Sequence, residues 1–223
     1  MIDFVNTVDR IGDEALTSSI IDRSITEILD NYVTSIGDYA FNGCKALTTV
    51  DFPAAKSIGT YAFKGCSALT TADFSAVKKI GESAFQSCSA LTTANFPIAT
   101  SIGTSAFQSC SALTTVNFST VTKIGSYAFS GCWKLTTADF SAAKSIGTYV
   151  FRDCYALTTL ILRSATMATL SNINALANTP IKKGTGYIYV PSALVDTYKA
   201  ATNWTTYANQ IRAIEDYPDI CGG

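Results

Sequence analysis

The hydrophobic positions of this chain repeat at an interval of 22 residues. A leucine, an Ile-Gly pair, a phenylalanine and a cysteine all keep this spacing, and five full units run from Leu47 to Ala156. A looser unit, Ile25–Ala46, precedes them, and a degenerate unit begins at Leu157. The repeated cysteines are Cys44, Cys66, Cys88, Cys110, Cys132 and Cys154. A period this strict predicts nearly identical structural units that stack into one continuous core.

The first half of a unit has the pattern of a strand. Val50 and Phe52 alternate with Thr49 and Asp51, which is the period of a strand with one buried face. Farther along the unit, apolar residues follow at a spacing of three, up to Ile58. That spacing predicts a turning coil rather than a second strand.

The second half of a unit changes direction. Gly59 recurs in every unit, which indicates either a positive φ or a close backbone approach at that point. Tyr61–Cys66 is too short for an independent helix, so it predicts a single helical or 3₁₀ turn. A strand with a short helical turn in about 20–29 residues is the plan of a leucine-rich repeat.

The motif Leu47-x-x-Val50-x-Phe52-x-x-Ala55-x-x-Ile58-Gly59-x-x-Ala62-Phe63-x-x-Cys66-x-x-Leu69 resembles the BspA-like leucine-rich repeat family. The resemblance covers roughly residues 25–165. It implies a right-handed α/β solenoid, with a parallel sheet on the concave face and helical or 3₁₀ turns on the convex face. It also implies a secreted or surface protein of a bacterium, including gut bacteria, with a role in adhesion and protein binding. Many members carry Leu or Ile where this chain has Ala72, Ala94 and Ala138, which predicts closer packing or small voids.

The chain divides into a cap at residues 1–24, a solenoid at 25–165 and a second cap at 166–223. Apolar residues from Ile11 to Ile20 have helical spacing, which predicts a helix that covers the first repeat. In the second cap we expect a turn-rich link at 180–186 and a strand at Tyr187–Val190, as in family members from gut bacteria. We then expect a helix capped by Ser192 and another that holds Trp204, Tyr207, Ile211 and Ile214. Trp204 suits the core of the cap better than a ligand platform.

The predicted strand carries two polar rows, which are the first candidate binding surface. Threonines come in pairs in every repeat, from Thr48-Thr49 to Thr158-Thr159, with an Asp or Asn two residues later. We expect these side chains to project outward, about 4.8 Å from one repeat to the next. The candidate ligand-binding residues are Thr49, Asp51, Thr71, Asp73, Thr93, Asn95, Thr115, Asn117, Thr137 and Asp139.

Three explanations of these rows remain open. Recent duplication together with the β-propensity of threonine would make them structural. A regular polar groove would bind a protein segment or a glycan. Threonine arrays also resemble ice-binding solenoids, although those present two outward threonines in each strand, and here the second outward position is Asp or Asn.

Aromatic residues at variable positions are a second candidate surface. Tyr61, Tyr127 and Tyr149 occupy equivalent sites on the outer turn, and Trp133 and Tyr155 replace a serine after their cysteines. Exposed Tyr and Trp favour interfaces, although single scattered ones are ordinary surface.

Nothing in the sequence points to catalysis or to a cofactor. Histidine is absent, no CxxC spacing occurs, and no nucleophile stands beside a base. The repeated cysteines are expected to form a ladder of small buried residues rather than disulfides or a metal site, whereas Cys221 is expected to be exposed and reactive. We therefore expect neither an enzyme nor a bound metal.

Composition narrows the partners further. Sixteen basic and 17 acidic residues give a net charge of −1, which predicts no binding to nucleic acid or to an anionic membrane. The longest apolar runs are too short to span a bilayer. Residues 1–6 lack the features of a signal peptide, so a cytoplasmic or phage-borne protein stands beside the surface location that the resemblance implies.

The sequence thus predicts noncatalytic binding of a protein or glycan, host-derived partners included, through the polar strand face. The competing function is a structural one, as a rigid spacer or a virion or cell-surface element. Ice binding is the third. The oligomeric state stays open.

Overall fold

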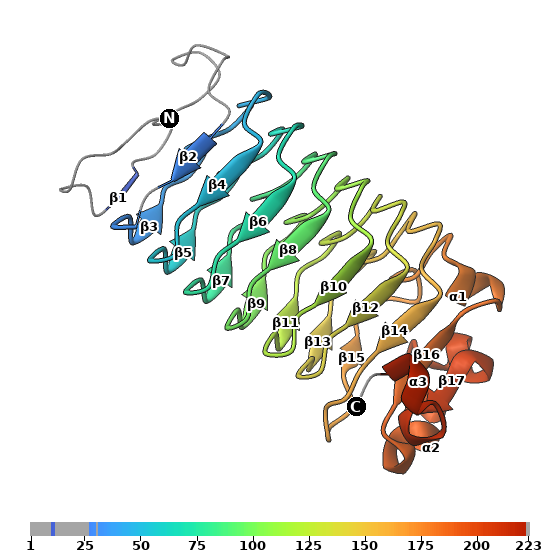
Figure 1. Ribbon diagram of the computed structural model, residues 1–223. Coiled ribbons are helices and arrows are strands. Elements are labelled where there is room, and N and C mark those ends of the chain that lie inside the picture. Colours follow the sequence, from blue (N-terminus) through green and yellow to red (C-terminus); the bar gives the residue numbers. More distant parts are fainter. Residues whose placement is uncertain (1–9, 12–26, 30, 222–223) are drawn as a thin grey trace.

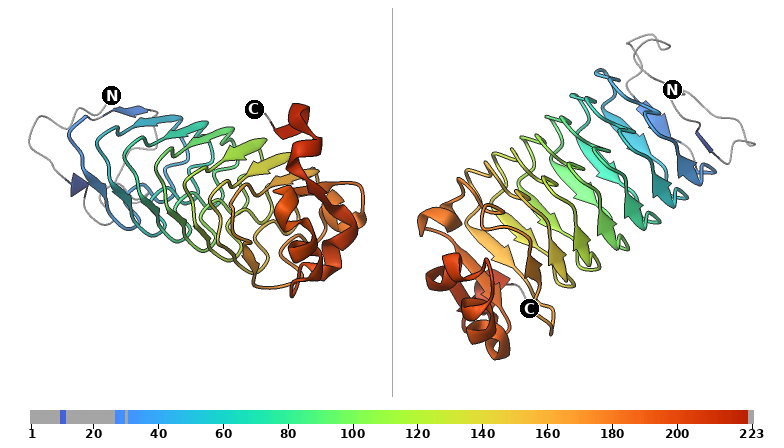
Figure 2. Two further views of the ribbon diagram at one scale, coloured as in Figure 1. Left: turned by 90° about the horizontal axis from the view of Figure 1, so that it is seen from below. Right: turned by 180° about the vertical axis from the view of Figure 1, so that it is seen from behind.

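The computed structural model describes residues 10–11, 27–29 and 31–221. The chain winds through successive coils of 22 residues that stack along one axis, and the C-terminal segment closes one end of the stack (Figures 1 and 2). The prediction of a repeat protein with parallel sheets is confirmed.

Each coil contributes one three-residue strand to a face built from two sheets of the described chain. The four-stranded sheet contains β2 (Glu27–Leu29), β4 (Thr49–Asp51), β6 (Thr71–Asp73) and β8 (Thr93–Asn95). The five-stranded sheet contains β10 (Thr115–Asn117), β12 (Thr137–Asp139), β14 (Thr159–Ile161), β16 (Tyr187–Val190) and β17 (Ile211–Ala213). All neighbours in both sheets are parallel and pair in register, residue for residue of the repeat.

Each coil also contributes a second strand, of two residues. Within the described ranges these strands form one eight-stranded parallel sheet: β1 (Arg10–Ile11), β3 (Ser35–Ile36), β5 (Ser57–Ile58), β7 (Lys79–Ile80), β9 (Ser101–Ile102), β11 (Lys123–Ile124), β13 (Ser145–Ile146) and β15 (Thr169–Leu170). The expectation of a turning coil around Ile58 is therefore wrong. The two-residue strand escapes sequence patterning because it is too short to show an alternation.

The expected helical or 3₁₀ turn at Tyr61–Cys66 is also wrong, and turns take its place. The amides of Tyr61, Phe63 and Gly65 donate to carbonyls of the next coil, at 2.8, 2.7 and 2.8 Å, so they are not available for helical bonds. Tyr61 itself has a φ of 57°. Lys64 and Cys66 still bond locally, to the carbonyls three residues earlier at 3.1 Å each, but pairing between coils takes the alternate amides and prevents a continuous helix.

Two stacks of phenylalanine rings fill the core. One runs from Phe41 to Phe151, with successive ring centroids between 4.9 and 5.7 Å apart. The other runs from Phe52 to Phe140, and its closest pair, Phe74 and Phe96, is 5.4 Å apart. These rings are fully buried or nearly so, and each stack contacts the other with tilted rings, so the two form one continuous aromatic core.

The two ends of the stack differ in part from the predicted caps. Ile11, expected on a helix, lies in β1 and pairs in parallel with β3, while the rest of the expected helix lies outside the described residues. At the other end both sheets run past residue 165, through β15 and β16. The strand expected at Tyr187–Val190 is confirmed.

The C-terminal segment is built from single turns of helix. These are α1 (Pro180–Lys183), η1 (Ser192–Leu194), α2 (Val195–Ala200), η2 (Thr205–Gln210), η3 (Ile214–Asp216) and α3 (Pro218–Cys221), where η denotes a 3₁₀ helix. Ser192 is not an N-cap: it lies inside η1, and its amide donates to Glu215. Ile211 was expected on a helix and instead forms β17, because it pairs with Ile188 of β16.

Trp204 belongs to the core of this segment, as expected, and is fully buried. Its Nε1 donates to the carbonyl of Ala168 at 2.8 Å, and the amide of Ala168 donates to the hydroxyl of Tyr198 at 2.8 Å. The segment is thereby fastened to the chain that leads into the last two-residue strand, β15.

The repeated glycine is explained by a close approach between coils. A Cβ on Gly103 would lie 2.7 Å from the carbonyl carbon and oxygen of Gly81, closer than side chains tolerate. The alternative of a positive φ applies elsewhere in the coil, at Tyr61 and Gly65.

We expect Gly103→Ala to lower the free energy of unfolding by about 1–3 kcal/mol, because two backbones must move apart. Urea unfolding followed by circular dichroism measures this, with Ser101→Ala in the same coil as control. Equal midpoints for the two variants would contradict the explanation.

Candidate functional site

The ten candidate residues of the polar rows lie on neighbouring strands of the three-residue face. We call them the Thr–Asp face. In each strand the middle residue turns into the core while Thr and Asp or Asn turn away from it, as in β4, where Val50 is buried between Thr49 and Asp51. Register pairing aligns Thr49 with Thr71 and Thr93, and aligns Thr115 with Thr137. The sequence rows therefore become rows in space.

The first threonine of several pairs has a structural role. The hydroxyl of Thr70 donates to the carbonyl of Thr48 at 3.2 Å, and that of Thr92 donates to the carbonyl of Thr70 at 3.1 Å. Thr136 bonds in the same way to Thr114. Bonding between coils accounts for these first threonines, and the second threonine of each pair is therefore the better candidate for contact with a partner.

The carboxylates of the face differ in their surroundings. Asp139 is half-buried and accepts bonds from Arg163, with Nε at 3.2 Å and Nη2 at 3.1 Å, and from the hydroxyl of Ser141 at 3.0 Å. Asp73 is exposed and accepts a bond from Nδ2 of Asn95 at 3.0 Å, and Asp51 is exposed as well. The negative charge available to a partner is therefore concentrated at the N-terminal half of the face.

Sequence reasoning missed Arg163. It lies two residues after Ile161, the residue that takes the Asp or Asn position in the next strand, β14. The replacement of Asp or Asn by Ile161 could have indicated that the polar row changes at this strand. The sequence did not show that the side chain of Arg163 would contact Asp139 in the preceding coil.

A groove opens in the middle of the face, where the four-stranded and five-stranded sheets meet. β8 and β10 are not paired, although they are neighbours in the stack. Ala94 in β8 is partly exposed, whereas its equivalents Ala72 and Val116 are buried. The groove has a volume of about 320 Å³, and it is lined by Thr92, Ala94 and five of the candidates: Asp73, Thr93, Asn95, Thr115 and Asn117.

The structure thus brings half of the Thr–Asp face together around one groove and leaves the rest at its two ends. Thr49 and Asp51 lie toward the N-terminal end, while Thr137 and Asp139 lie toward the C-terminal segment (Figure 1).

Comparison with known proteins identifies the repeat. The model of the BspA type leucine-rich repeat region, in six copies, matches residues 9–100 and 97–193. The chain belongs to the BspA-type leucine-rich repeat family. Among curated proteins, none is similar enough to match.

Solved structures of leucine-rich repeat proteins share this fold. A leucine-rich repeat protein from Bacteroides ovatus is 25% identical over 74% of this chain and 47% of its own length, with a TM-score of 0.57. The pneumococcal vaccine antigen PcpA is 14% identical over 92% of this chain and 59% of its own length, with a TM-score of 0.59. This BspA-type chain therefore spans about half the length of these proteins.

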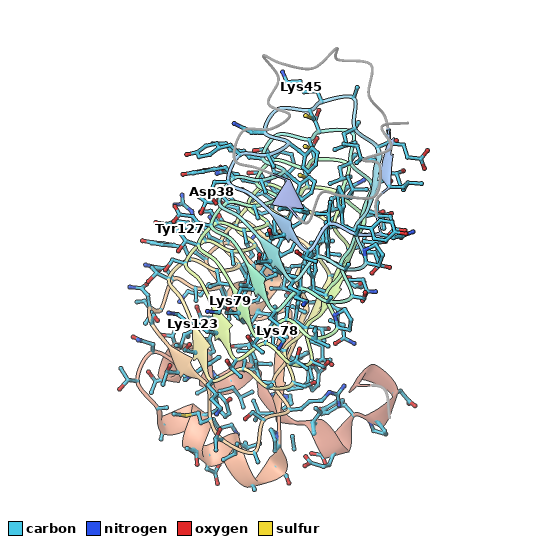
Figure 3. All side chains as sticks on the ribbon, turned by 90° about the vertical axis from the view of Figure 1, so that its left-hand side faces the viewer. Asp38, Lys45, Lys78, Lys79, Lys123 and Tyr127 are labelled. Atoms are coloured by element: carbon cyan, nitrogen blue, oxygen red, sulfur yellow. The ribbon has the colours of Figure 1, made fainter. Side chains whose placement is uncertain are left out.

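The tyrosines on the outer turn form stacked pairs. The rings of Tyr127 and Tyr149 are 5.1 Å apart, and Tyr61 stacks on Tyr39 at 4.8 Å. Ser83 and Ser105 hold the equivalent positions in the coils between, so the pairs are separate. Figure 3 shows Tyr127 projecting from the side of the stack.

Trp133 and Tyr155 are the more exposed aromatic candidates. They are 57% and 53% exposed, and they occupy equivalent turns of adjacent coils. The hydroxyl of Tyr155 lies 3.4 Å from the carboxylate of Asp153. Both rings are exposed enough to contact a partner. In the sequence of the repeat they lie on the turn after the cysteine and not on the strands that line the groove.

The repeat cysteines are free thiols, and five of the six are fully buried, as expected. Each buried thiol donates to the carbonyl of the phenylalanine 25 residues earlier, as Cys66 does to Phe41 at 3.1 Å. Burial raises the pKa of the Cys44 thiol to about 11 and that of Cys132 to about 12. The side chain of Cys221 lies outside the described residues.

The part of the chain that the structure describes contains no group of three or more His, Cys, Asp or Glu residues placed to hold a metal ion. In the same part, no helix is long and apolar enough to cross a membrane.

The cysteine ladder makes stability depend on pH. The folded-state pKa values are raised, so this contribution is complete below about pH 8.5, where unfolded thiols are protonated, and is lost as the pH rises toward 11–12. We expect the urea midpoint to fall above pH 9, with up to about 1.4 kcal/mol per pH unit for each thiol that stays protonated only in the fold.

The control is Cys88→Ala/Cys110→Ala, measured with reductant present. Its midpoint should fall less steeply, because it lacks two buried thiols. Parallel curves for this variant and the parent would show that other groups cause the loss. Titration with a thiol reagent at pH 8 should label none of the buried repeat cysteines before unfolding, with Cys221→Ser as the background.

Proposed function

We propose that this BspA-type chain is a noncatalytic binding module that recognises a protein or glycan through the Thr–Asp face. The observation that carries the proposal is the groove between β8 and β10, because it gathers Asp73, Thr93, Asn95, Thr115 and Asn117 in one exposed place. Their hydroxyl, amide and carboxylate groups offer both donors and acceptors to a partner.

The groove fits a binding role better than a catalytic one. It is open to solvent, and its side chains come from strands whose positions are held by pairing on either side of the gap. Rigid strands preorganise the polar groups and reduce the entropy cost of binding. We further propose, from the family resemblance, that the solenoid is right-handed and that this face is its concave side, where a long partner would contact several coils at once.

The exposed carboxylates at the N-terminal end of the Thr–Asp face narrow the chemical classes of partner that would bind there. Asp51 and Asp73 are exposed, whereas Arg163 already neutralises Asp139. A protein segment with basic residues toward the N-terminal end of the groove, or a neutral glycan rich in hydroxyls, suits this distribution. We place the protein at the bacterial surface or outside the cell, host-derived partners included, as the family resemblance implies.

A structural role as a spacer is the second candidate. It is favoured by the number of hydroxyls that bond from one coil to the next, such as Thr122 to Thr100 at 3.2 Å and Ser111 to Ser89 at 3.2 Å. Such bonds stiffen the stack whether or not a partner is bound.

Charge reversal in the groove separates these two functions. We expect Asp73→Lys/Asn95→Lys/Asn117→Lys to abolish specific binding in a screen against extracellular-matrix proteins, mucins and a glycan array. The reason is that three lysines would fill the groove and invert its charge. Circular dichroism verifies that the variant is folded.

The matched control puts three lysines on the turns after the cysteines, as Ser67→Lys/Ser89→Lys/Ser111→Lys, at the position where the first coil carries Lys45. Binding that survives in the control and is lost in the groove variant supports the proposal. Absence of any specific partner, or binding that the groove variant keeps, would favour the spacer or the exposed aromatic residues.

A further inference from the structure

The near-zero net charge of the chain conceals a segregation of charge between its two sheet surfaces. Asp51 and Asp73 are exposed on the Thr–Asp face. On the outer surface of the eight-stranded sheet and the residues that lead into it, the exposed charged side chains are lysines. We call them the lysine strip: Lys56, Lys78, Lys79, Lys123 and Lys144.

The strip forms two adjacent rows along the stack. Lys79 and Lys123 are outward residues of β7 and β11, and both pair in register with Ser101 of the strand between them. Lys78 bonds through its amide to the carbonyl of Lys56 in the preceding coil, at 3.2 Å. Figure 3 shows Lys78, Lys79 and Lys123 on one side of the stack, apart from Lys45.

The positive charge of the strip exceeds the negative charge that lies near it. None of the five ammonium groups forms an ion pair within the described residues, whose ion pairs involve Arg152 and Arg163. The carboxylates closest in the repeat are Glu82, beside Gly81, and Asp38 near the first coil, where Asp38 accepts a bond from the amide of Thr60 at 2.6 Å. The middle and C-terminal parts of the strip therefore have an excess of positive charge.

A trough runs beside the lysines because the repeated glycine cannot be replaced. Lys79, Ser101 and Lys123 line a hollow of about 350 Å³ whose floor is made by Gly81, Gly103 and Gly125. A side chain at Gly103 would collide with the backbone of Gly81, so close stacking itself keeps the trough clear. A hollow at equivalent positions nearer the N-terminus, from Ser35 to Gly59, is lined by Asp38 and by no lysine, so the basic trough is confined to the middle of the sheet.

We propose that the lysine strip and its trough bind a sulfated polysaccharide that lies along the axis of the solenoid. Lys79 and Lys123 are two strand spacings apart, about 10 Å, and they would contact successive sulfate groups. Ser101 lies between Lys79 and Lys123 in the same row, and Ser57 and Ser145 flank the two lysines. The three serines provide hydroxyls that both donate and accept hydrogen bonds. The flat, rigid rows match an extended chain.

The composition of the strip distinguishes this ligand from other polyanions. Its outward positions are Lys, Ser and Thr, with no aromatic ring on which a nucleic acid base would stack. It also lacks the apolar side chains that peripheral proteins insert into a membrane surface. A polysaccharide needs neither, because its contacts are ionic and hydroxyl-mediated.

The test uses dextran sulfate, unmodified dextran and an oligo-dT strand as probes of the full chain at 150 mM NaCl. We expect binding to dextran sulfate, none to dextran, and at least 10-fold weaker binding to oligo-dT. Lys79→Ser/Lys123→Ser should weaken dextran sulfate binding by about 10-fold and lower the slope of log affinity against log salt by up to about two. Serine already occupies equivalent positions in neighbouring coils, so the variant should fold normally.

A control variant removes two positive charges, as the strip variant does, but from lysines outside the lysine strip. Lys45→Ser/Lys134→Ala changes two exposed lysines on the turns after the cysteines, where other coils carry Ser and Ala. It should weaken dextran sulfate binding by less than threefold. Equal losses in both variants, no binding by the parent chain, or oligo-dT binding as tight as dextran sulfate binding would each overturn the proposal.

Discussion

Backbone pairing between equivalent residues of successive coils is the constraint on which the rest of the structure depends. Because neighbouring strands pair in register, as Ser57 does with Lys79 and Lys79 with Ser101, each residue lies above its counterpart 22 positions away. Each side chain must then pack against the equivalent side chain of the next coil, one strand spacing away. Rings stack on rings, thiols bond to carbonyls of the preceding coil, and the glycine row must stay free of side chains. The strict period of the sequence is the consequence of this geometry.

The same constraint produces the surfaces. Identical residues at one position of the repeat form a line along the stack. A single residue that differs from the others in its line therefore changes the surface at one place only. Arg163 beside Asp139 closes one end of the Thr–Asp face, and the missing pairing between β8 and β10 opens its middle. In the eight-stranded sheet, Lys79 and Lys123 take the position that Ser101 holds in the strand between them, and they make that sheet basic. The two sheets thus offer chemically different surfaces to the two proposed classes of partner.

Sequence reasoning predicted the parts that depend on one coil or on exact repetition. The parallel stack, the outward Thr and Asp positions, the buried cysteines and the core position of Trp204 all follow from periodic burial. It was wrong where pairing between coils overrides local preference. The turn at Tyr61–Cys66 gives every second amide to the next coil, which prevents a continuous helix. Ile211 forms part of β17 because β16 offers an edge to pair with.

The sequence alone determined the repeat, its buried face and its family, because a 22-residue period constrains every coil in the same way. Only the tertiary structure decided which polar residues meet. Whether two neighbouring strands pair or separate, as β8 and β10 do, depends on the packing of whole coils and leaves no mark in a single row. The charge of each face likewise emerges only when rows are stacked, since the net charge of −1 averages over both. The groove and the lysine strip are therefore properties of the fold, although the sequence supplies every residue in them.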